Sequence, residues 1–161
     1  MHYSTRSKFR ILIFSSKNFN DINWVTSKKI PNIGEFELKH KNDLNLYARR
    51  IRELAQKIRN LGSKPIFVTQ AKASYRIKNG EIFGEAKADG TPNLEEYIGL
   101  KAINTATLKV CKSIFAICID LAGKLHFEDG DHYDSVHTSP SGSKKIGKFL
   151  YDELKTKILQ Q

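Results

Sequence analysis

The chain has 161 residues, 40% of them hydrophobic, which suits one domain of ordinary size with a buried core. Its 27 lysine and arginine residues outnumber 17 aspartate and glutamate residues, and the net charge of +10 can favour nucleic acid, anionic membrane surfaces or acidic ligands. Because the basic residues are scattered along the sequence and form no block, we expect no specific nucleic-acid partner.

No apolar run reaches membrane-spanning length, and the first residues contain no long apolar segment. We therefore expect no transmembrane segment and, for the chain as given, a cytoplasmic location. Export directed by a signal sequence lost from the N-terminus is the alternative.

The first expected element is a buried parallel strand over Arg10–Phe14, a short apolar run that ends at two serines. Residues 17–41 are polar and irregular, which predicts a long connection. The clearest helix follows over residues 43–61, with Asn42 or Asp43 as its cap and Gly62 as its stop signal. Its apolar stripe recurs every three or four residues: Leu44, Tyr47, Ile51, Leu54, Ile58 and Leu61.

The second half continues the alternation of strands and helices. Ile66–Thr69 is a strand, and residues 71–92 are a hairpin insertion turning at Asn79-Gly80, at the sheet edge where ligands bind. A helix over Thr91–Lys112 and a strand over Ile114–Ile119 come next.

A loop over Asp120–Tyr133 then leads to a last helix, which Ser141 or Ser143 caps. Alternating strands and helices predict right-handed parallel crossovers. The expected fold is thus a single three-layer α/β/α domain over residues 1–161 with a mostly parallel sheet.

The two cysteines lie on either side of the junction between the helix over Thr91–Lys112 and the strand over Ile114–Ile119. Cys111 falls at the helix end and Cys118 inside the strand, without the spacing of a metal site. We expect both to be buried, reduced thiols, and the sequence predicts neither a metal nor another cofactor.

The loop before the last helix carries the candidate chemistry. Asp134 stands three residues before His137, so its carboxylate can orient the imidazole and fix its tautomer while the imidazole acts as a general base. The same loop holds five other polar residues of irregular spacing, which we interpret as a solvated acidic loop rather than a metal site: His126, Glu128, Asp129, Asp131 and His132.

These residues resemble the last sequence block of the SGNH, or GDSL-type, hydrolases. That block places Asp-x-x-His between the last core strand and the C-terminal helix, and here Asp134-Ser135-Val136-His137 is followed by Gly142 and a helical pattern over Lys144–Leu154. The preceding strands and helix are similar too, so the resemblance covers about residues 43 to 158. It implies a flavodoxin-like fold and hydrolysis of a small ester or acylated glycan, with His137 as base and Asp134 as its orienting group.

The resemblance also implies groups that the chain does not match well. The family's Gly-Asp-Ser nucleophile block has no counterpart, since Ser15-Ser16 lacks both its glycine and its aspartate. For the oxyanion donor of a Gly-x-Asn-Asp motif the candidate is Asn20, with Asn18 where the glycine belongs, while the rival Asn42-Asp43 reads better as a helix cap. Asn104 is expected to be structural, as a partner for backbone groups at the sheet edge.

The sequence therefore predicts an SGNH-hydrolase-like protein related to esterases, truncated before its nucleophile and inactive as given. The alternative is a non-catalytic module that uses its basic surface and the 71–92 insertion to bind carbohydrate, lipid or protein.

Overall fold

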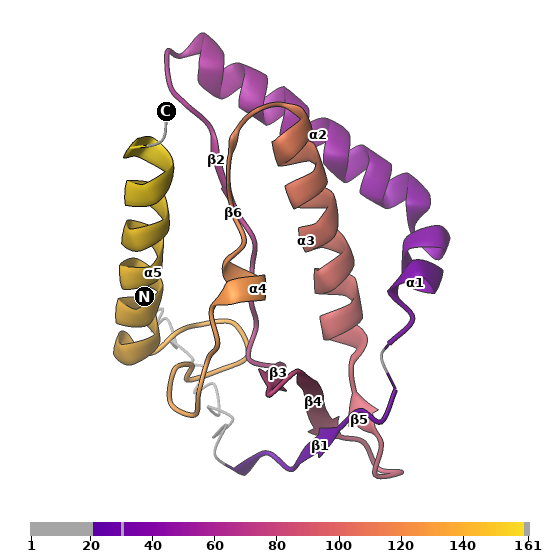
Figure 1. Cartoon of the computed structure of the whole chain (residues 1–161). Coiled ribbons are helices and arrows are strands. Elements are labelled where there is room, and N and C mark those ends of the chain that lie inside the picture. Colours follow the sequence, from indigo (N-terminus) through magenta and orange to yellow (C-terminus); the bar gives the residue numbers. More distant parts are fainter. Residues whose placement is uncertain (1–20, 30, 160–161) are drawn as a thin grey trace, which may run out of the picture.

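The structure, a computed structural model, describes residues 21–29 and 31–159 (Figure 1). The predicted strand Arg10–Phe14, the serines after it and Asn20 lie outside the described residues. The elements follow in the order β1 (Trp24–Thr26), α1 (Ile33–Lys39), α2 (Lys41–Asn60), β2 (Ile66–Val68), β3 (Tyr75–Lys78), β4 (Glu81–Ala86), β5 (Pro92–Asn93), α3 (Glu95–Ser113), β6 (Ile117–Ile119), α4 (Leu121–Lys124) and α5 (Pro140–Leu159).

A parallel pair of strands forms the centre of the molecule. β2 and β6 pair with Ile66 opposite Ile117 and Val68 opposite Ile119. Helix α3 packs on this pair with α2 behind it, and α5 lies on the other side of the strands (Figure 1). The best-buried apolar side chains belong mainly to α2, α3 and β6: Ile51, Ala55, Tyr97, Leu100, Ala102, Val110, Cys111, Ile117 and Ile119.

The remaining strands form a second, antiparallel sheet. β3 and β4 are a hairpin whose turn residues Asn79 and Gly80 have φ values of 52° and 80°. Two successive positive φ values are the geometry of a type I′ turn, which matches the twist of the flanking strands. β1 and β5 each pair antiparallel with β4, so the insertion is a small sheet at one end of the molecule (Figure 1).

The chain is thus a mixed α/β protein, but the expected mostly parallel sheet is not what its described strands form. Among the strands of residues 21–29 and 31–159, only β2 and β6 pair in parallel. The reason is that the connections form strands of their own. Residues 17–41, predicted to be irregular, include β1 and α1, and residues 71–93 supply three antiparallel strands.

Three helices begin at residues other than those predicted. The N-cap of α2 is His40, whose side chain makes no capping bond, so Asn42 and Asp43 lie inside the first turn. α3 begins at Glu95 because Pro92–Asn93 is taken up by β5. α5 begins at Pro140, and the hydroxyl of Ser139 accepts a hydrogen bond from the Gly142 N–H in place of the predicted serine caps.

The prediction of two reduced thiols was wrong, because Cys111 and Cys118 form a disulfide with a Cα–Cα distance of 5.9 Å. The turn from α3 into β6 brings the two backbones within the range that a disulfide spans. The two cysteines are seven positions apart in sequence, a spacing that does not by itself indicate whether they are bonded.

Within residues 21–29 and 31–159, no helix combines the length and apolar character needed to cross a bilayer.

Candidate acid–base site

The candidate site lies on the long loop between β6 and α5, at the carboxyl ends of the parallel strands. Asp134 and His137 meet there: Asp134 Oδ2 and His137 Nδ1 are 2.7 Å apart. Asp134 Oδ1 also accepts hydrogen bonds from the backbone N–H groups of Val136, at 2.8 Å, and His137, at 2.6 Å. Both carboxylate oxygens are therefore used to hold one imidazole in place.

These contacts determine the charge of Asp134. Hydrogen bonds from the His137 and Val136 N–H groups, followed by the His137 side chain, lower the pKa of Asp134 from 3.8 to about 2. All three stabilise the carboxylate form. Asp134 is thus ionised throughout the physiological range, as an orienting group must be.

The imidazole of His137 is held on one side and open on the other. The Tyr133 ring stacks on it nearly parallel, with a centroid distance of 5.6 Å and an interplanar angle of 8°. Its side chain is 65% exposed. With Nδ1 bound to Asp134, Nε2 is the ring nitrogen left to take a proton, which is the geometry of a general base.

Helix α5 packs against the start of the candidate loop, at Asp131. The buried Asp131 carboxylate accepts from Lys145 Nζ at 2.6 Å and from the Glu128 N–H at 2.8 Å. Its backbone carbonyl accepts from the Ser139 N–H at 2.9 Å and lies so close to Gly142 that a side chain there would overlap it. Gly142 therefore has a packing role: it lets the helix approach the loop.

The same geometry corrects the interpretation of the loop as solvated. Asp131 and His132 are buried, and His132 packs edge-on against Phe127 at 4.7 Å between centroids. Burial lowers the pKa of His132, although the nearby aspartates oppose this. Glu128 and Asp129 are exposed and form ion pairs, and among the described residues no group of three or more His, Cys, Asp or Glu side chains is arranged to hold a metal ion.

Hydrogen bonds connect the residues after β2 to the segment between β6 and α5. Thr69 donates to the Asp120 carboxylate at 2.9 Å and accepts from the Ala122 N–H at 2.9 Å. The Ala73 N–H donates to the Ser135 carbonyl at 3.1 Å, so the segment after β2 runs alongside the candidate loop.

Asn104 has the structural role expected of it. This buried side chain of α3 accepts from the Gln70 N–H at 3.0 Å and donates to the Gln70 carbonyl at 2.7 Å. It satisfies the backbone just beyond β2, where the strand pairing ends, and contributes no group to the acid–base pair.

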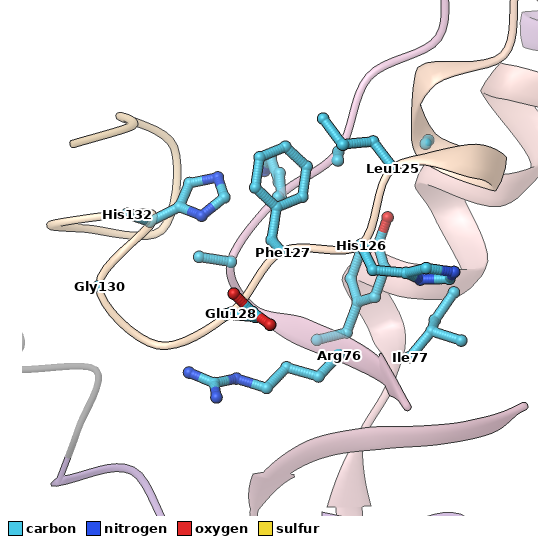
Figure 2. Close-up of a pocket in the computed structure, with 13 residues that line it drawn as sticks. Arg76, Ile77, Leu125, His126, Phe127, Glu128, Gly130 and His132 are labelled. Atoms are coloured by element: carbon cyan, nitrogen blue, oxygen red, sulfur yellow. The ribbon is translucent and has the colours of Figure 1, made fainter. Parts of the chain in front are cut away.

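A cavity separates the segment after β2 from the loop that leads to the site (Figure 2). Arg76 and Ile77 on β3 line one side, and the other side is lined by Leu125, His126, Phe127, Glu128, Gly130 and His132. Its volume of about 40 Å³ suits a few water molecules rather than a substrate. Arg76 is held beside it by an ion pair with Asp129 and by the Trp24 ring, 4.3 Å from its guanidinium carbon.

The structure therefore brings together two of the three predicted site residues, Asp134 and His137, while Asn20 lies outside the described part of the chain. Sequence reasoning missed Tyr133 and Lys145. A lysine in the first turns of a helix and a tyrosine in a polar loop are common, so neither carried a signal of its own.

Comparison with known proteins provides no relative: no family model, no curated protein and no solved structure matches the chain.

Proposed function

We propose that the loop between β6 and α5 is the acid–base part of an ester-hydrolase site of the SGNH type, with His137 as the general base and Asp134 as its orienting carboxylate. The observation that carries the proposal is the double use of Asp134. One oxygen fixes the imidazole through Nδ1, and the other binds two backbone N–H groups of the same loop.

The fold and position of the loop support this proposal. The pair stands after a parallel strand and before a helix that needs a glycine at its closest approach, as in the family's last block. The finer fold belongs to the same proposal: a flavodoxin-like, mostly parallel arrangement in which β2 and β6 are two of the strands.

The described residues supply no nucleophile. No serine hydroxyl among them is bonded to the His137 ring, and the three serines that follow His137 in sequence are engaged elsewhere. Ser139 and Ser141 donate to the Gly130 carbonyl, and Ser143 pairs with Thr138. Acyl transfer needs a nucleophile for the base to deprotonate, so we propose that the chain as given does not turn over a small ester or acylated glycan.

A fluorophosphonate probe, which reacts with a serine activated by a base, tests this proposal. We expect no His137-dependent labelling of the 161-residue chain, and p-nitrophenyl ester hydrolysis equal to that of His137→Ala. A chain extended by a strand ending in Gly-Asp-Ser should be labelled at that serine, and His137→Ala should remove the labelling.

Absence of His137-dependent labelling in the extended chain, with the fold intact by circular dichroism, would refute the proposal. Labelling of Ser15 or Ser16 in the 161-residue chain would instead support the assigned base and refute the proposed inactivity.

The disulfide is relevant to the cellular compartment in which the protein acts. Disulfides persist in oxidising surroundings and are rare in the cytosol. The Cys111–Cys118 bond therefore favours export over the cytoplasmic location that we expected, and we propose an extracytoplasmic site of action.

A further inference from the structure

The end of the molecule opposite the candidate site gathers the turn between α2 and β2, the turn between α3 and β6, and the last turns of α5 (Figure 1). The two turns are tied together, because Arg59 donates to the Ile114 carbonyl at 2.5 Å and the Ile117 N–H donates to the Pro65 carbonyl at 3.1 Å. Lys157 of α5 lines the same hollow as Lys112 and Cys118. We call residues 54–66, 109–117 and 154–159 the basic pole.

The three segments of the basic pole carry charge of one sign, and Asp120 is the acidic residue in the lining of the hollow beside them. The basic pole contains no aspartate or glutamate, and its seven cationic side chains are Lys57, Arg59, Lys64, Lys109, Lys112, Lys155 and Lys157. All but Lys64 make no ion pair within the described residues. Four carboxylates lie at the other end, on the loop of residues 128–134: Glu128, Asp129, Asp131 and Asp134. The fold therefore brings basic residues from three distant segments of the sequence to one end of the molecule.

Apolar side chains project from the same pole. Phe115 is 95% exposed, Leu61 is 82% exposed and Leu159 is 76% exposed. A cluster of exposed large apolar side chains marks an interaction surface more often than chance.

Phe115 is the least expected of these residues. Its φ of 52° lies in the left-handed region, which disfavours a side chain and suits glycine. A bulky apolar side chain here gains nothing from the core and costs backbone strain, and the Cys111–Cys118 disulfide closes the turn that bears it. Nothing in the fold requires a phenylalanine at this position, so a contact outside the chain is the better explanation.

We infer that the basic pole is a docking surface for an anionic lipid bilayer, in which Phe115 and Leu61 enter the interface and the surrounding lysines contact acidic headgroups. This inference is independent of the proposed hydrolase site. Interfacial binding combines apolar insertion with electrostatic attraction to anionic lipid, and both components are present on this surface.

The combination favours a bilayer over nucleic acid. A phosphate backbone would be bound by the lysines alone and would leave exposed leucine, isoleucine and phenylalanine side chains without a partner. Since the pole lies at the amino ends of β2 and β6, docking would direct the loop of Asp134 and His137 away from the membrane, toward substrates in solution or on a glycan layer.

Co-sedimentation with vesicles tests the inference. The chain should sediment with vesicles of phosphatidylcholine and phosphatidylglycerol, bind pure phosphatidylcholine at least about tenfold more weakly, and dissociate as salt is raised. Phe115→Gly should bind about tenfold more weakly while its melting temperature is unchanged or higher, because glycine suits this φ. Lys112→Gln/Lys157→Gln should also bind about tenfold more weakly.

Matched controls lie away from the pole. Leu38→Ala removes an exposed leucine of α1, and Lys28→Gln/Lys29→Gln removes two exposed lysines that follow β1. Both should bind vesicles like the wild type. Equal weakening by pole and control variants, equal binding to neutral vesicles, or binding to duplex DNA without binding to vesicles would each overturn the inference.

Discussion

Asp134 makes the folded state sensitive to acid. Its folded pKa of about 2 lies below the ordinary 3.8, so its contribution to stability is present above the ordinary value and is lost as the pH falls from about 4 to about 2. The difference in free energy of unfolding between the wild type and Asp134→Asn should be constant at higher pH and shrink across that window. Urea denaturation at a series of pH values measures it, and a difference that persists unchanged below pH 2 would contradict the assigned contacts.

Gly142 lets α5 approach the loop because its side chain is a single hydrogen atom. A methyl group at this residue would overlap the Asp131 carbonyl, whereas Gly147, one turn and a half further along α5, has open space around it. We therefore expect Gly142→Ala to destabilise the protein by about 1 to 3 kcal/mol through overpacking. Gly147→Ala should stabilise it by up to about 1 kcal/mol through helix propensity. Thermal denaturation compares the two, and equal effects would show that α5 does not approach the loop this closely.

At the scale of elements, the turn between α3 and β6 depends on its disulfide. A closed loop of seven residues restricts the unfolded chain by about 2 kcal/mol. Replacing both cysteines, in Cys111→Ser/Cys118→Ser, should cost about that much in free energy of unfolding, and a reductant should have the same effect on the wild type but none on the double variant. If the reductant changes neither protein, the cysteines are not bonded in solution.

Elements that express a local pattern could be predicted from the sequence. The apolar stripe of α2 and the Asn79-Gly80 turn each specify their structure over a few residues, and the structure has both. The Asp134–His137 contact is equally local, because three residues of loop join donor and acceptor.

What could not be predicted depends on contacts distant in sequence. β1 has only three residues, too few to show an alternating pattern, and it pairs with the edge that β4 offers. Lys145 reaches Asp131 only because α5 returns to the loop, and the disulfide depends on the turn geometry. A three-residue strand, a lysine and a cysteine carry no pattern that indicates such partners.

The whole molecule combines two ends of different character. The carboxyl ends of β2 and β6 carry the acidic loop with Asp134 and His137, and the amino ends carry the basic pole with its exposed apolar side chains. Net charge and composition reveal neither end, because α3 and α5 bring together residues that are distant in sequence. The disulfide carries the proposed extracytoplasmic location, and the arrangement of the basic pole carries the proposed role of the basic residues.

The role proposed for Asp134 fixes the tautomer of His137. If Asp134 orients the imidazole as a base, the neutral ring must carry its proton on Nδ1 and leave Nε2 free to accept one. A long-range ¹H–¹⁵N NMR spectrum above the pH at which the ring is protonated distinguishes the two nitrogens. We predict the Nδ1–H tautomer in the wild type and its loss in Asp134→Asn. A neutral His137 in the Nε2–H form, or a tautomer unaffected by Asp134→Asn, would contradict the account.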